Sequence, residues 1–343
     1  MNKKPLTISV LIPSYNEEKS IAACIDSCLN QSRPVDEIII IDDGSTDTTP
    51  EILSSYGAKI TNIRLKKNTG NKSIAQEIGL SYVKTDVFIA TDADTILDRD
   101  FVKFVEEDFN SDSKIVAVAG YIRSLKHNWL TACRELDYVI GQDFHKVAQE
   151  YIGSLLVIPG CAGAFKAQVF KEHITFDHDT LTEDLDFTYK FNKKELKIYF
   201  DKRAIVHTQD PATIGVYAKQ MRRWYAGGWQ NLKKHINILE RPASALEISM
   251  TYIESFMFAF MLFVVPLISF PVFLKMLALV LAYVVSIGLY ASIRRRRIDL
   301  LLYSPTYLIV ALINSYIFLS EFVRELILNK KNLIWYNPER RAN

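Results

Sequence analysis

The chain has 343 residues, of which 49% are hydrophobic and 23% charged, so it is long enough for two or three domains and too apolar to be disordered. Its 41 Lys and Arg nearly balance 39 Asp and Glu, and a net charge of only +2 argues against nucleic acid as a partner. The four cysteines lack a paired zinc spacing, which predicts reduced, structural thiols.

Residues 1–240 predict one α/β domain, because short runs rich in Ile and Val alternate with stretches of helical spacing. The expected strands cover residues 6–12, 37–41, 59–65 and 87–90. This alternation predicts a Rossmann-like, mainly parallel sheet. Ligands of such sheets bind beyond the carboxyl ends of the strands, so the residues that follow each strand are the first candidates for a site.

Polar motifs follow three of these strands. Residues 13–17 read Pro-Ser-Tyr-Asn-Glu, and Asp42-Asp43-Gly44 comes directly after the second strand. Two adjacent carboxylates at a strand end can accept hydrogen bonds from a nucleobase or from ribose hydroxyls. The same residues also suit an ordinary turn and helix cap, and the motif alone leaves both interpretations open.

The third motif is Thr91-Asp92-Ala93-Asp94, directly after the apolar run 87–90. In an extended segment, carboxylates at positions i and i+2 project to the same side and converge on one hard cation. Mg²⁺ or Mn²⁺ suits this donor set better than zinc, because no Cys or His is nearby in the sequence. A solvated acidic loop is the alternative.

A helix expected at about residues 213–235 carries Gln220, Arg223 and Trp224 at spacing i, i+3 and i+4, so the three share one face. Arg can clamp a diphosphate, Gln can add a neutral donor, and Trp offers a flat platform for a sugar ring. The basic residues and tryptophans of this helix also suit a position at a membrane surface, and both interpretations can hold together.

Residues 250–328 predict a membrane domain of two or three helices, followed by a basic tail at residues 329–343. The segments 256–274, 276–292 and 301–319 contain no charged residue. Basic residues flank the first two segments, which predicts a cell-membrane protein of multi-pass type with a cytoplasmic N-terminal domain. The third segment contains Pro305, so it either spans fully or bends there. No N-terminal stretch resembles a signal or anchor.

The motifs at residues 13–17, 42–44, 92–94, 182–184 and 220–224 occur in an order that resembles family 2 glycosyltransferases of the GT-A fold. The resemblance extends to the membrane-embedded branch of hyaluronan, chitin, cellulose and poly-N-acetylglucosamine synthases. It implies a GT-A domain that binds a UDP-sugar. Gln209 stands where the polymerising enzymes usually carry Glu, which leaves acceptor handling open.

The resemblance also implies a role for each matching residue. Asp184, in Thr-Glu-Asp, would be the general base, and Glu183, Gln220, Arg223 and Trp224 would contact the diphosphate or the acceptor. Asp94 would be the direct metal ligand, with Asp92 beside it. The loop that begins at Gly160 resembles one lining the acceptor site, although its small residues also suit tight strand packing. The nucleotide pocket would comprise Pro13, Tyr15, Glu17, Asp42, Asp43, Lys72 and Asp92.

The predicted function is inverting transfer of a sugar from a UDP-sugar to a hydroxyl acceptor at the cytoplasmic membrane face, extending a β-linked polysaccharide. The alternative is a single transfer to a membrane lipid, such as a polyprenyl phosphate or a sphingolipid-like alcohol. A more distant alternative is a non-catalytic scaffold that binds UDP. The small membrane part predicts a partner membrane protein or a homo-oligomer if a polymer must be conducted.

Overall fold

The computed structural model describes residues 5–331 and 333. By packing, this part of the chain divides into two units. The first comprises residues 5–123 with 153–209, and the second comprises residues 124–152 with 210–331. Most of the predicted basic tail at residues 329–343 lies outside the described residues.

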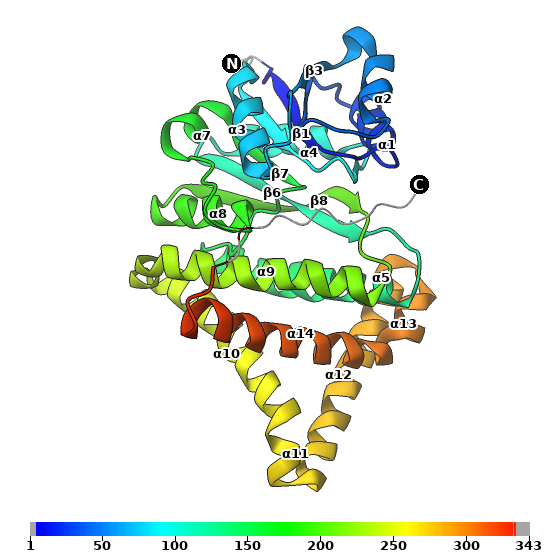
Figure 1. Cartoon of the computed structure of the whole chain (residues 1–343), viewed down its shortest axis with the longest axis vertical. Coiled ribbons are helices and arrows are strands. Elements are labelled where there is room, and N and C mark those ends of the chain that lie inside the picture. Colours follow the sequence, from blue (N-terminus) through cyan, green and yellow to red (C-terminus); the bar gives the residue numbers. More distant parts are fainter. Residues whose placement is uncertain (1–4, 332, 334–343) are drawn as a thin grey trace. The chain divides into compact units, whose positions relative to one another are not determined.

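The first unit is built on one mixed sheet. In the described part of the chain, eight strands follow the order β3-β2-β1-β4-β7-β6-β8-β5 (Figure 1). Their bounds are β1 (Ile8–Ser14), β2 (Glu37–Asp42), β3 (Thr61–Arg64), β4 (Val87–Ala90), β5 (Thr95–Leu97), β6 (Ile115–Ser124), β7 (Gly163–Lys166) and β8 (Lys197–Thr208).

The half of the sheet formed by β1 to β4 is parallel, as the sequence predicts, since β1 pairs with β2 and β4, and β2 pairs with β3. All four expected strands are present within two residues of their predicted starts. The other half is antiparallel, with pairs β4–β7, β6–β7 and β5–β8. The alternation of apolar runs and helical stretches in the first 90 residues predicts only the parallel strands. It gives no information about the antiparallel half.

Helices cover both faces of the sheet, so consecutive residues of a strand enter different cores. Ile38 and Ile40 pack with α1 and α4 on one face, whereas Ile39 and Ile41 pack with α3, α7 and α8 on the other. The bounds of these helices are α1 (Ile21–Leu29), α2 (Thr49–Ser55), α3 (Lys72–Tyr82), α4 (Phe101–Ser111), α7 (Ala167–His173) and α8 (Glu183–Lys193).

The second unit is helical. Its first part comprises α5 (Trp129–Val139), a π-helical turn at Ile140–His145 and α6 (Lys146–Ile152). The helix predicted near residues 213–235 is α9 (Ile214–Lys234), which Thr213 caps through its side chain. The remaining elements are α10 (Pro242–Phe263), α11 (Val265–Ile268), α12 (Phe270–Arg295), α13 (Ile298–Tyr303) and α14 (Tyr307–Phe322), with a π-helical turn η5 at Val323–Ile327.

Three helical stretches in the described residues are long and apolar enough to cross a membrane, at Pro242–Ile268, Phe270–Arg295 and Ile298–Ile327. The predicted boundaries of the first segment, 256–274, are wrong because the chain turns back between α10 and α12. The turn is itself apolar, so charge gives no sign of it. The third stretch contains a short 3-10 turn at Ser304–Thr306, where Pro305 interrupts the helix.

Candidate active site

The loops that follow β1 and β2 are joined at the carboxyl end of the parallel strands. β1 and β2 run in register with Ser14 opposite Asp42. Asn16 adopts a left-handed conformation, its N–H donates to Ser45 Oγ at 3.0 Å, and its Oδ1 accepts from Thr46 N at 2.8 Å. The structure therefore places the motif at residues 13–17 beside the one that begins at Asp42. The bridging role of Asn16 was not predicted.

The two aspartates of this motif have different surroundings. Asp42 is fully buried, its Oδ1 accepts from Ser45 N at 2.9 Å, and its Oδ2 lies 3.4 Å from Arg64 Nε. Asp42 thus stabilises the turn of the alternative interpretation, whereas the N-cap residue of α2 is Thr48. Asp43 instead accepts two hydrogen bonds from Thr69, at 2.9 Å from the backbone N and 2.8 Å from Oγ1. Burial raises the pKa of Asp43, against the effect of these two bonds.

Gly44 permits this arrangement for a steric reason. Its φ is +72°, and a Cβ at this position would lie 2.6 Å from the backbone N of Asn68. Any larger residue would therefore push the segment at residues 67–69 away and displace Thr69 from Asp43.

The motif after β4 forms a turn. Thr95 N donates to the carbonyl of Asp92 at 3.0 Å, so the extended geometry assumed for Asp92 and Asp94 is wrong. The turn arises because β5 begins directly at Thr95. Both carboxylates still affect the same neighbouring group, the Cys161 thiol. Burial raises the pKa of this thiol, and the charges of Asp92 and Asp94 raise it further.

Lys72 joins two of the predicted motifs. Its Nζ lies 2.6 Å from Asp92 Oδ1 and 2.8 Å from Glu183 Oε1. Burial on its own would lower the pKa of Lys72, but the two carboxylates, Asp92 first, hold it above its usual value. Lys72 therefore stays charged and holds the starts of α3 and α8 against the end of β4.

Asp184 lies next to this ion-pair cluster, in the first turn of α8. Its Oδ1 accepts from Leu185 N at 2.9 Å and its Oδ2 from Gly160 N at 3.4 Å. Burial, followed by the charge of Glu183, raises the pKa of Asp184 to about 6. At neutral pH this carboxylate is mostly ionised, yet it binds a proton more readily than an ordinary aspartate.

The loop at Gly160 packs directly on the same cluster. A Cβ at Gly160 would lie 3.2 Å from Lys72 Nζ, 3.5 Å from Glu183 Oε1 and 3.6 Å from Asp184 Cβ. Gly160 therefore fits beside the ion pair and Asp184 because it has no side chain. A larger residue at this position would be crowded by Lys72 and Glu183.

Three other aspartates, Asp177, Asp179 and Asp186, lie close enough together to hold a metal, and they are the one such group of three found among the described residues. Lys190 Nζ lies 2.8 Å from Asp177 and 2.7 Å from Asp186. A protein cation already pairs with two of these three carboxylates, so their proximity alone does not argue for a metal.

Gln220, Arg223 and Trp224 belong to the second unit, on α9. The guanidinium of Arg134, on α5, lies 5.0 Å from the centre of the Trp224 ring and forms ion pairs with Asp137 and Asp210. Arg134 was not predicted, because its aromatic partner lies far along the chain. A joint role of these α9 residues with Asp184 stays a prediction.

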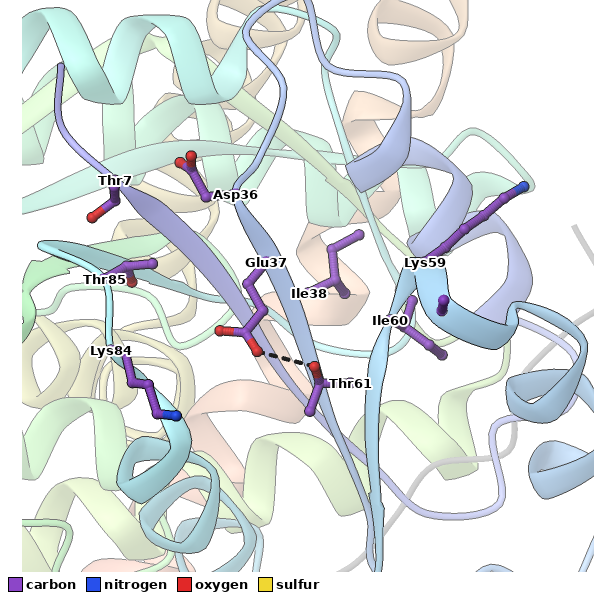
Figure 2. A pocket seen from close by; sticks show the side chains of 10 residues that line it. Thr7, Asp36, Glu37, Ile38, Lys59, Ile60, Thr61, Lys84 and Thr85 are labelled. Atoms are coloured by element: carbon purple, nitrogen blue, oxygen red, sulfur yellow. Dashed lines mark hydrogen bonds between the residues drawn. The ribbon is translucent and has the colours of Figure 1, made fainter.

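A separate hollow of about 420 Å³ lies at the other ends of the strands. Figure 2 shows its lining at the starts of β1, β2 and β3, where Thr61 Oγ1 donates to Glu37 Oε1 at 3.0 Å. Asp36 and Lys84 also line it. None of the residues predicted for nucleotide or metal lines this hollow, so we do not assign it to the active site.

Comparison with known proteins identifies the class. Residues 9–173 match the family model described as glycosyl transferase family 2. This part of the chain therefore carries the family 2 glycosyltransferase domain that its motifs predicted.

The curated relatives include poly-beta-1,6-N-acetyl-D-glucosamine synthases of two staphylococci. The Staphylococcus epidermidis protein is 31% identical over 228 residues, which cover 66% of this chain and 55% of that protein. The Staphylococcus aureus protein is 31% identical over 244 residues, which cover 68% of this chain and 58% of that protein. The chain thus spans little more than half the length of these relatives.

Two solved structures share the fold. A mannosyltransferase from Pyrobaculum calidifontis, in complex with GDP-Man and Mn²⁺, aligns with a TM-score of 0.58 at 18% identity, covering 91% of this chain and 88% of that one. A fragment of S. aureus TarS in complex with UDP aligns with a TM-score of 0.53 at 16% identity, covering 92% and 91%. At these identities the likeness supports the predicted GT-A fold and nothing finer.

Proposed function

We propose that this chain transfers a sugar, with inversion, from a UDP-sugar to a hydroxyl acceptor at a membrane, and that it extends a β-linked polysaccharide. The observation that carries the proposal is the contact of Lys72 with Asp92 and Glu183, with Asp184 adjacent. These contacts bring together motifs that are far apart in the sequence. The motifs form one charged cluster at the carboxyl ends of the strands.

In this mechanism Asp184 is the general base. It removes the proton from the acceptor hydroxyl while that oxygen forms a bond to the anomeric carbon, and the bond from that carbon to UDP breaks. UDP leaves with the electron pair, on the face opposite the attacking oxygen. A base with a pKa of about 6 is mostly ionised at neutral pH, and it still gains from accepting the proton.

Asp43 and Asp42 belong to the proposed nucleoside pocket together with Pro13, Tyr15 and Glu17. Asp43 is the better candidate for direct contact, because the Asp42 carboxylate is occupied by Ser45 and Arg64. Glu17 already accepts a hydrogen bond from Ser20 Oγ at 2.7 Å, which suits a role in shaping the pocket. TarS, which shares the fold, is solved in complex with UDP, so the fold accommodates a uridine nucleotide.

A divalent cation, Mg²⁺ or Mn²⁺, would neutralise the diphosphate when bound. Carboxylate oxygens are the donors that these ions prefer, and Asp94 with Asp92 fit that requirement. Lys72 already neutralises part of the charge of Asp92, so Asp94 is the main proposed ligand. The P. calidifontis enzyme, which shares the fold, is solved in complex with Mn²⁺, so the fold accommodates such an ion.

N-acetylglucosamine is the proposed sugar, because the curated relatives are named for a polymer of it. A single transfer to a membrane lipid is the second candidate. It is favoured by the few membrane helices of the described chain, which are too few to enclose a polymer without a partner protein or further copies.

The test is to incubate the purified chain in lipid with radiolabelled UDP-N-acetylglucosamine and, in parallel, UDP-glucose, and to separate products by size and by organic extraction. A ladder of water-soluble chains is the expected result. A single extractable glycolipid would support transfer to a membrane lipid instead of polymer extension. Binding of UDP without any transfer would support the non-catalytic scaffold.

A further inference from the structure

The third apolar stretch lies alongside α9. In Figure 1 α14 and α9 run side by side within the second unit, whereas α10 and α12 converge on α11 away from them. Four hydrogen-bonded pairs join α9 to α14, to the turn η5 and to the residue Asn329 that follows it. From one pair to the next the residue number rises in both segments, so the two helices are parallel and in contact along their lengths. The pairs are Tyr217–Asn314 at 2.8 Å, Arg222–Glu321 at 3.4 Å, Gln230–Glu325 at 3.1 Å and Lys233–Asn329 at 2.6 Å.

This pairing ties α14 to a strongly cationic helix. The carboxylates of Glu321 and Glu325 are 1% and 5% exposed, so they face α9 and the adjoining turn instead of lipid. Arg324 forms ion pairs with both of them. α9 contains five basic residues and no acidic one, namely Lys219, Arg222, Arg223, Lys233 and Lys234.

If α14 crossed the bilayer, α9 would have to cross with it. Each Arg or Lys at the centre of a membrane helix costs about 2.5–3.5 kcal/mol even on the most favourable scale. At the membrane surface the same side chains remain hydrated and contact anionic headgroups, which favours binding. The pair is therefore suited to the interface and poorly suited to the hydrocarbon.

The outer side of α14 has the pattern of a helix that lies on lipid. Its exposed apolar residues recur at helical spacing and form one stripe, while Val310, Ile317 and Phe318 are buried in the protein. Of the three apolar stretches, this one is the least hydrophobic and the most buried within the protein. The stripe consists of Ile309, Leu312 and Tyr316 on α14 and continues with Val323 and Ile327 on η5.

The hairpin carries fewer charges along its length, namely Glu247 and Glu254 on α10 and Lys275 on α12 before the basic end at Arg294 and Arg295. α10 has 22 residues and α12 has 26, which gives lengths of about 33 and 39 Å against a hydrocarbon core of about 30 Å. Arg241 precedes it and the basic run 294–297 follows it, and exposed apolar residues such as Leu267 and Ile268 cover its tip.

We infer that α9 and α14 form a parallel pair embedded in the membrane–water interface, that only the hairpin of α10 and α12 crosses the bilayer, and that the chain after α14 emerges on the side where the hairpin begins. The occupant of the apolar stripe is the acyl-chain boundary of the bilayer. This inference does not depend on the proposed function.

The first test uses the full chain in sealed vesicles of known orientation, with a membrane-impermeant maleimide added from one side or from both. The native cysteines are buried or partly buried, so the unmodified chain supplies the background. Leu328→Cys should be labelled from the same side as Glu240→Cys, and Leu267→Cys from the opposite side. Labelling of Leu328→Cys from the side of Leu267→Cys would overturn the inference, as would labelling of all three from one side.

The second test measures depth in the same vesicles with spin labels at Leu312, Tyr316 and Val323, all exposed. A helix in the interface holds the three labels at one depth within a few ångströms, whereas a spanning helix separates the outer two by about 16 Å. Labels at Leu274 and Tyr283 of α12 are the control, because a crossing helix separates them by about 13 Å. A depth gradient along α14 similar to that along α12 would refute the inference.

Discussion

The ammonium of Lys72 lies 2.6 Å from the carboxylate of Asp92, which joins the first turn of α3 to the loop after β4. The same ammonium contacts Glu183, a neighbour of the proposed base. Salt bridges from one lysine to two motifs make the geometry of these motifs interdependent, so removing the cation should affect both folding and donor binding.

Lys72→Met should lower the free energy of unfolding by about 3 kcal/mol, because it leaves two carboxylates near each other without their cation. It should also weaken UDP binding. Lys72→Arg, which keeps the charge, should recover part of both losses. Denaturant unfolding and equilibrium binding of UDP measure the two effects, with Lys66→Met at an exposed position as the control. If Lys72→Met bound UDP as tightly as the unmodified chain, Lys72 would have no part in the donor site.

The turnover rate should depend on pH through Asp184. Because its pKa is about 6 and the ionised form is the base, activity should be near its maximum above pH 7 and fall about tenfold per unit below pH 6. The measurement is the rate of UDP release at saturating donor from pH 5 to 8. Glu172→Gln, at an exposed carboxylate in the same unit, should leave the profile unchanged. A flat profile across pH 5 to 7 would exclude a base with this pKa.

Gly44→Ala should destabilise the chain and weaken UDP binding together. The left-handed backbone costs a non-glycine residue on the order of 1 kcal/mol, and the new Cβ would also clash with the backbone of Asn68. Gly57→Ala is a matched control, because Gly57 has φ +53° and nothing within 4 Å of its Cβ position. It should lose only the stability due to backbone strain and keep its UDP affinity. Equal effects of the two variants on UDP binding would contradict the steric role of Gly44.

Removal of divalent metal should abolish transfer, and Mn²⁺ or Mg²⁺ should restore it. Binding of Mn²⁺ in the presence of UDP, followed by electron paramagnetic resonance, should weaken at least tenfold in Asp94→Asn. Asp179→Asn should have no effect on it, because Asp179 belongs to a separate acidic group in which Lys190 already pairs with Asp177 and Asp186. Full activity in a chelator would remove the metal from the mechanism.

The sequence predicts the parallel half of the sheet well, because buried runs such as residues 38–41 are continuous and apolar. It fails where geometry depends on distant partners. The antiparallel pairing of β7 with β4, the contact of Arg134 with Trp224 and the hydrogen bonds of Thr69 to Asp43 have no local signal. The turn between α10 and α12 was missed because it is as apolar as the helices that it joins.

The candidate site shows the same division. Motif order predicts roles for Asp92, Glu183 and Asp184, and the structure brings these residues together around Lys72, while their roles stay predictions. The sequence does not predict that the Asp42 side chain points into the protein. An Asp-Asp pair is the same in sequence whether its first carboxylate binds a ligand or stabilises a turn.

The most direct test of the account is to compare Asp184→Asn with the unmodified chain for both UDP affinity and transfer from radiolabelled UDP-N-acetylglucosamine. We predict UDP affinity within about twofold and a loss of transfer of at least a hundredfold, as expected when a positioned base is removed. Transfer at near the unmodified rate with intact UDP binding would contradict the assignment of Asp184 and the mechanism built on it.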